Sequence, residues 1–120
     1  MQTVAFRVQV PVARPGRVPV RQGTKVRAIM QLVAKHMKIN AEAMLAPSRC
    51  KEEIARARQV AMYLTHTTQE MPMSEVALAF GRDRTTVSYA CHLVEDMRDD
   101  EKFDAMLIGL EDLIEGLDGE

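Results

Sequence analysis

One stretch of this chain, residues 80–91, restricts the possible folds more than any other. It places a single glycine, Gly81, just before a pattern in which apolar residues recur every three or four positions. These apolar residues are Val87, Ala90, Cys91, Val94 and Met97. Asp83 precedes the first turn of this helical pattern, where its carboxylate can accept hydrogen bonds from free backbone amides. The stretch therefore predicts a tight turn and a helix with one buried face, which is the second half of a helix-turn-helix unit.

The other face of this predicted helix begins with short polar side chains and a guanidinium. Its members are Asp83, Arg84, Thr85, Thr86 and Ser88. Such donors and acceptors suit base edges and phosphates. The same residues would also form an ordinary solvated first turn, so this cluster alone does not establish DNA contact.

Helical spacing of apolar residues extends through most of the chain and predicts an all-α fold. We expect a helix from Lys25, a short helix over Ala41–Leu45 capped by Asn40, and a long helix over residues 51–67. A short helix capped by Ser74 would run to Phe80. Asp99 or Asp100 would cap a last helix with an apolar stripe, formed by Phe103, Met106, Leu107, Leu110, Leu113, Ile114 and Leu117.

Residues 1–24 are different in character, and we treat them as a basic N-terminal segment beside a domain over residues 25–120. Apolar residues alternate from Val4 to Val12, and Pro15-Gly16 follows, which fits a short hairpin. The basic, proline-punctuated composition fits a flexible arm equally well. Both alternatives stay open at this point.

The net charge of -1 over 120 residues conceals a strong asymmetry along the chain. Residues 1–41 carry a net charge of +8, and residues 99–120 carry -8. A near-neutral total therefore does not argue against nucleic-acid binding, because the local field decides it. The sequence shows no transmembrane run and no compact signal-peptide core, and its two cysteines lack metal-ligand spacing. We expect a cytoplasmic protein with reduced thiols, no metal, no cofactor and no catalytic set.

Two segments together resemble the C-terminal DNA-binding domain of the bacterial replication initiator DnaA. One is the basic helix over residues 55–64, and the other is the helix-turn-helix pattern over residues 74–91. The resemblance implies a sequence-specific contact with double-stranded DNA. It implies major-groove contacts for the cluster from Asp83 to Thr86, and phosphate contacts for Ser74, Arg58 and Gln59. It also implies a minor-groove arginine in the preceding loop, for which Arg49 is the better candidate and Lys51 the reserve.

The chain departs from the family pattern at several positions. A single glycine precedes Arg82-Asp83 where the family usually has two, and Arg84 replaces the usual histidine. An arginine there can make a bidentate contact with guanine, so the preferred sequence can differ. The acids Glu52 and Glu53 follow the loop and would repel phosphate.

No phosphate-binding loop of the Gly-x-x-x-x-Gly-Lys-Ser/Thr type occurs in the chain, so we expect a stand-alone module without an ATPase domain and without nucleotide. Two uses remain open: a transcriptional or replication regulator, or a protein-interaction adaptor that has lost specific DNA reading. We expect the acidic last helix to pack on its own domain through its apolar stripe. The alternative is that this stripe binds a second copy of the chain or a partner protein.

Overall fold

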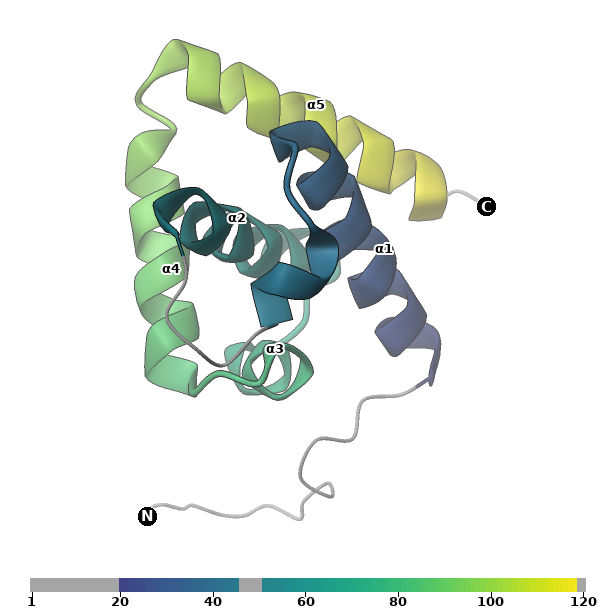
Figure 1. Ribbon diagram of the computed structural model, residues 1–120. Helices are drawn as coiled ribbons and strands as arrows, with labels where there is room; N and C mark the ends of the chain where they lie inside the picture. The colour runs from purple at the N-terminus through teal and green to yellow at the C-terminus, as the bar shows by residue number, and fades with distance from the viewer. Residues whose placement is uncertain (1–19, 46–50, 119–120) are drawn as a thin grey trace.

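The computed structural model describes residues 20–45 and 51–118, and these residues are almost entirely helical (Figure 1). Five α-helices and one 3-10 helix follow one another: α1 Val20–Met37, η1 Ala41–Leu45, α2 Glu52–Thr68, α3 Met73–Phe80, α4 Arg84–Met97 and α5 Glu101–Asp118. The described part of the chain contains no strand, which confirms the predicted all-α class. None of its helices is long and apolar enough to cross a membrane.

Helix α2 is the centre of the fold, because it contacts every other helical element. Figure 1 shows α4 along one side of it, α1 on the other, α3 below and α5 across the top. Seven of its 17 residues are therefore buried, including Val60 and Leu64, which have no exposed surface. Apolar residues from all the elements complete one continuous core around this helix, as their periodic spacing predicts.

Side-chain caps fix the starts of η1 and α5, as the sequence predicts. The carboxamide oxygen of Asn40 accepts the amide of Glu42 at 2.8 Å, at the start of η1. Asp100 accepts the amide of Phe103 at 2.8 Å, so Asp100 rather than Asp99 caps α5. Each bond satisfies a backbone donor that the first helical turn leaves without a partner.

Helix α1 begins at Val20, five residues before the predicted start at Lys25. The predicted start rested on the apolar stripe, which begins only at Val26, and the added residues of α1 include Gly23. A glycine weakens a helix by about 1 kcal/mol, which does not stop a helix that is held by packing further along. Residues 1–19, the rest of the predicted arm or hairpin, lie outside the described residues.

The apolar stripe of α5 is used within its own domain. Leu107, Leu110 and Ile114 are buried in the core, and α5 contacts both α1 and α2. Leu113 was predicted to share this face, but 54% of it is exposed. The stripe is narrower than predicted, because a helix packed across the top of two others buries only the residues directly beneath it.

Arg98 at the end of α4 joins α4 to α2 and α5. Its guanidinium donates to both carboxylate oxygens of Glu111, to Asp104 and, at 3.1 Å, to the hydroxyl of Tyr63. The hydroxyl of Tyr63 donates in turn to Glu95 at 2.8 Å. Glu111 contributes most to raising the pKa of Arg98, while burial is the main cause that raises the pKa of Tyr63. This network positions α5 relative to the end of α4.

Thr65 on α2 is a buried polar residue that lowers the stability of this core. Its side chain has no exposed surface, and its hydroxyl has no hydrogen-bond partner among the described residues. A buried hydroxyl without a partner costs roughly 1–3 kcal/mol. We expect Thr65→Val, which keeps the shape, to raise the free energy of unfolding by about 1 kcal/mol in urea denaturation.

Thr68→Val is the matched control for this substitution. The Thr68 hydroxyl donates to the carbonyl oxygen of Leu64 at 2.7 Å, so its removal loses a bond and brings no gain. If the two substitutions had equal effects, or if Thr65→Val lowered the stability, the hydroxyl of Thr65 would not be a destabilising group without a partner.

Candidate nucleic-acid interface

The turn between α3 and α4 is closed by the backbone of a single glycine. Gly81 adopts a φ of 66° and a ψ of 34°, the left-handed region that glycine occupies without steric cost. The amide of Arg82 donates to the carbonyl oxygen of Ala77 at 2.9 Å, and that of Gly81 donates to Leu78. This pair of bonds terminates α3 in a Schellman motif. Only residues 81–83 separate the two helices, so the single glycine suffices to build a helix-turn-helix unit.

Asp83 caps α4 as the sequence predicts. Its carboxylate oxygen Oδ1 accepts the amide of Thr86 at 2.8 Å while its backbone is extended. The backbone amide of Thr86, and secondarily its side chain, lower the pKa of Asp83. The cap holds the first turn of α4 in a fixed geometry at the surface.

The polar cluster predicted from the sequence lies together on this first turn. Asp83, Arg84, Thr85 and Thr86 are all exposed, whereas the opposite face of the helix, from Val87 to Val94, is buried. Ser88 is half-buried, and its carbonyl oxygen lies 2.9 Å from Nδ1 of His92. The first turn of α4 is thus a rigid, accessible platform of one guanidinium and two hydroxyls.

Tyr89 belongs to the same exposed face, although the predicted set of site residues omitted it. It is 63% exposed and follows Thr85 by four residues, so the two side chains lie one turn apart. His92 is also exposed, and Asp96 follows it by four residues. The helical spacing was the available signal for Tyr89. Asp96 places an acidic side chain beyond the N-terminal half of this exposed face.

The other predicted contacts come from α2 and the loop before it. Lys51 is exposed at the N-cap of α2. Arg58 is half-buried, and its Nε donates to the carbonyl oxygen of Met44 at 2.6 Å, which ties η1 to α2. The carboxamide oxygen of Gln59 accepts from Arg56 at 2.8 Å. Arg49 lies outside the described residues.

Ser74 does not cap α3 as the sequence predicts. The helix begins at Met73 with Pro72 as its N-cap, and the carbonyl oxygen of Pro72 accepts the amides of Glu75 and Val76. The proline presets its own φ and takes these first bonds, so the helix starts before the serine. Ser74 therefore lies exposed within the first turn.

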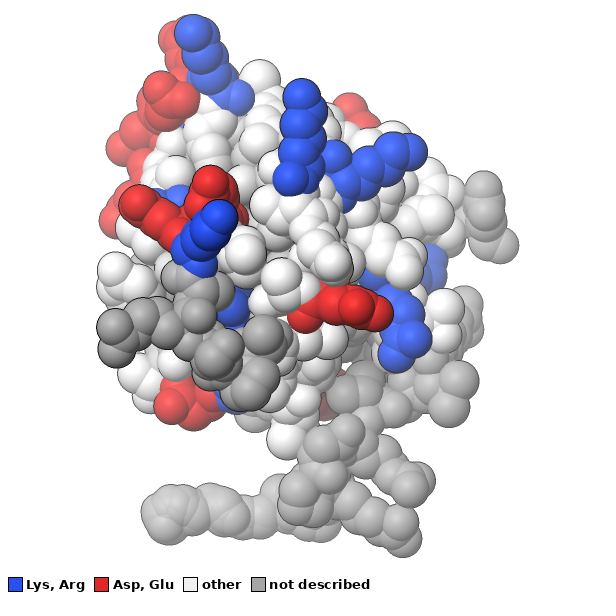
Figure 2. All heavy atoms as spheres, in the orientation of Figure 1, with Lys and Arg blue, Asp and Glu red and all other residues white. Residues whose placement is uncertain are grey.

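Charges of both signs are interspersed on the face that Figure 2 shows. Acidic side chains gather in this view where α4 ends and α5 begins. The sequence of this junction contains Asp99, Asp100, Glu101 and Asp104. The other end of α4 carries Arg84 and Arg82. The start of α4 therefore carries two guanidinium groups beside the Asp83 carboxylate, whereas its finish is acidic.

Comparison with known proteins places this arrangement in a family. The description "Bacterial dnaA protein helix-turn-helix" matches residues 26–94, from α1 into α4. The chain belongs to the family of bacterial DnaA helix-turn-helix domains.

Curated members of this DnaA family are similar over most of the chain. The chromosomal replication initiator protein DnaA of Chloroflexus aurantiacus is 32% identical over 101 residues, which is 82% of this chain and 21% of that protein. DnaA of Chromobacterium violaceum is 40% identical over 74 residues, 61% of this chain and 16% of that protein. The chain thus spans about a fifth of the length of the initiators that it matches.

A solved structure supports the DnaA fold independently. A crystal structure of a DNA replication initiation factor superposes with a TM-score of 0.71 at 30% identity, over 78% of this chain and 29% of the other. The likeness therefore extends beyond the helix-turn-helix to the arrangement of the whole helical domain.

The cap at Asp83 predicts a pH dependence of the DnaA-like domain without DNA. Because the hydrogen bonds from Thr86 lower its pKa in the folded state, the carboxylate stabilises the fold above its unfolded pKa, near 4. This contribution is lost as the pH falls through the lower, folded value. In thermal unfolding between pH 2 and 6, wild type should lose this part of its stability below pH 4.

Asp83→Asn is the matched control, because the amide keeps a capping oxygen but does not titrate. The melting temperatures of wild type and Asp83→Asn should approach each other or cross as the pH falls. If the difference between the two melting temperatures stayed constant across this pH range, the charge of the Asp83 carboxylate would not contribute to the cap.

Proposed function

We propose that this protein binds double-stranded DNA in a sequence-specific manner through its helix-turn-helix. The observation that carries the proposal is the capped, exposed first turn of α4, presented by a three-residue turn in a DnaA family domain. In this proposal α4 lies in the major groove, where side chains can distinguish all four base pairs. The role is regulation of transcription or replication on the bacterial nucleoid, at DnaA-box-like or diverged sites.

Each predicted residue has a part in the proposed complex. Arg84 and Thr85 read base edges, with Asp83 and Thr86 beside them, and Ser88 and Ser74 contact phosphates. Tyr89 and His92 extend the surface along the backbone of the groove.

Lys51 and Gln59 add contacts from α2, and Arg49 enters the minor groove from the preceding loop. Arg58 already bonds Met44, so its main effect on DNA is to position the segment that leads into this loop.

The test of the proposal is selection of bound sequences from a random duplex library by the full chain. An enriched sequence that resembles the DnaA box supports competition with the initiator at its own sites. A different enriched sequence supports an independent regulator. The absence of any enrichment would overturn specific reading and leave the alternative, an adaptor that uses the fold for protein contacts.

The basic N-terminal segment adds non-specific affinity in this proposal. Residues 1–19 contain Arg7, Arg14 and Arg17 and no acid. If these arginines neutralise phosphates, removing residues 1–19 should shallow the slope of log K against log salt by roughly 0.9 for each lost contact. The deletion stops at residue 19, because Val20 starts α1.

The control for this deletion is a full-length chain with Arg7, Arg14 and Arg17 replaced by glutamine. It should reproduce the shallower slope while keeping the length of the segment. If both variants showed the same slope of log K against log salt as the wild type, the segment would not contact DNA phosphates.

Self-association through α5 remains a separate proposal. The core of its apolar stripe is buried within the domain, so such contact would use Ile108 and Leu113, which are exposed. Sedimentation of wild type and Leu113→Asp at several concentrations tests it, and an unchanged monomer in both would exclude it.

A further inference from the structure

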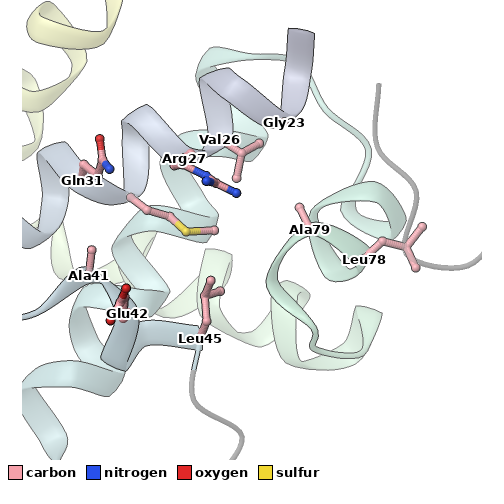
Figure 3. A pocket seen from close by; sticks show the side chains of 10 residues that line it. Gly23, Val26, Arg27, Gln31, Ala41, Glu42, Leu45, Leu78 and Ala79 are labelled. Carbon is pink, nitrogen blue, oxygen red and sulfur yellow. The ribbon is translucent and has the colours of Figure 1, made fainter. Parts of the chain in front are cut away.

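A groove between α1, η1 and α3 is not used by the proposed DNA contact. It encloses about 450 Å³ and is shown in Figure 3. Apolar residues make up most of its lining, among them Val26 and Met30 of α1 and Leu78 of α3. Arg27, Gln31 and Glu42 contribute the polar side chains. The polar first turn of α4 takes no part in this lining, so the groove is independent of the helix that faces DNA.

The groove brings together apolar side chains that the domain itself leaves in water. Five large hydrophobic residues of the described chain are exposed, and two of them line this one groove. Leu45 is 45% exposed and Leu78 is 38% exposed, although they come from elements 33 residues apart. Such a convergence of exposed apolar surface is the usual sign of a contact site.

The N-terminal segment of the same chain has the complementary pattern. Apolar residues occupy alternate positions, at Val4, Phe6, Val8, Val10 and Val12. An extended chain with this spacing carries all five side chains on one face. The described part of the domain has no strand with which such a segment could pair. Its apolar face is therefore better buried against a groove between helices than in an isolated hairpin, which is marginal in water.

The distance between segment and groove is short. Gly23, in the first turns of α1, lines the groove, so the chain enters α1 beside it. Residues 12–19 connect the alternating pattern to α1 and span up to about 26–29 Å when extended. Because Gly23 lies only three residues after the start of α1 at Val20, the groove begins beside the end of this connection. Closing such a short loop adds little entropic cost.

We infer that the apolar face of residues 4–12 docks in the groove of α1, η1 and α3 within the same molecule. Phe6 provides the largest apolar side chain of the segment and packs against Leu45 and Leu78. The docked segment lies next to η1, which leads directly into the loop that contains Arg49.

The test places the photo-crosslinker p-benzoylphenylalanine at position 6 or position 9 of the full chain. Docking predicts that Phe6→p-benzoylphenylalanine forms bonds within one molecule to peptides that contain Leu45, Met30 or Leu78. Gln9→p-benzoylphenylalanine, on the opposite face, should form several-fold fewer of these bonds. Mass spectrometry of the monomer band identifies the sites, and dilution should leave the yield unchanged.

Substitutions in the groove supply the control. Leu78→Asp should lower the crosslink yield from position 6 several-fold, whereas Leu113→Asp, at an exposed leucine of α5 outside the groove, should leave it unchanged. Crosslinks that join two copies would overturn docking within one chain and assign the groove to a second copy. Crosslinks only outside the groove, or none, would overturn the inference altogether. Neither result bears on DNA reading by α4, which the library selection tests separately.

Discussion

Replacing Arg98 with alanine is expected to lower the free energy of unfolding by about 2–3 kcal/mol. The guanidinium is only 19% exposed and bonds Asp104 and Glu111 directly. Its removal leaves these two carboxylates close together, with Glu95 nearby on Tyr63, and no cation between them. Removing one partner from a partly buried charge network lowers the free energy of unfolding by more than the intact network contributes to it. The reason is that the remaining charges stay partly buried without an opposite charge beside them.

Arg56→Ala is the matched control for this prediction. Arg56 is a half-buried arginine that, among the described residues, bonds the neutral side chain of Gln59 at 2.8 Å, so its removal should cost much less. Denaturation in urea measures both variants. Equal losses would contradict a special role for Arg98, and a loss below about 0.5 kcal/mol would show that the network does not hold α5 to α2 and α4.

Replacing Arg84 with alanine is expected to weaken binding to the selected duplex about 5- to 150-fold, which corresponds to 1–3 kcal/mol. The side chain lies exposed at the first position of α4, beside the Asp83 cap that fixes the turn. A guanidinium there can form two hydrogen bonds with guanine, so its loss should also relax the preference at one base pair. Fluorescence anisotropy with single-base variants of the duplex measures both effects.

Lys102→Ala provides a control with the same change in net charge. Lys102 is exposed on α5, beyond the end of α4, so its removal tests only the overall field. It should change affinity little and leave the base preference intact. A loss for Arg84→Ala that is uniform across all duplex variants would leave Arg84 a phosphate contact and remove it from base reading.

Local sequence patterns were sufficient for most of the fold. The apolar periodicity identified each helix, and the caps Asn40, Asp83 and Asp100 form the bonds that their positions predict. Each of these features depends on residues within a few positions of one another. Two helix starts were predicted wrongly because neighbouring residues change them. The carbonyl oxygen of Pro72 accepts the first hydrogen bonds of α3, so this helix starts before Ser74. Helix α1 extends through Gly23 to Val20, because packing further along the helix stabilises it.

Long-range features had no such local signal. Arg98 meets Tyr63 across 35 residues and Glu111 across 13, and neither pairing follows a helical or strand period. The groove likewise joins Leu45 to Leu78 through the crossing of three elements. For the candidate site, the sequence indicated the exposed first turn of α4 but not that Arg58 bonds the backbone of Met44. Only the packing of η1 on α2 reveals that contact.

Sequence-specific reading by α4 is tested most directly by a ratio of affinities. The full chain is titrated with the duplex enriched by selection and with a duplex of the same bases in scrambled order, at one salt concentration. Specific recognition predicts binding to the enriched duplex that is roughly 10³-fold tighter or more. Equal affinity for the two duplexes would contradict it, because phosphate contacts alone do not depend on base order.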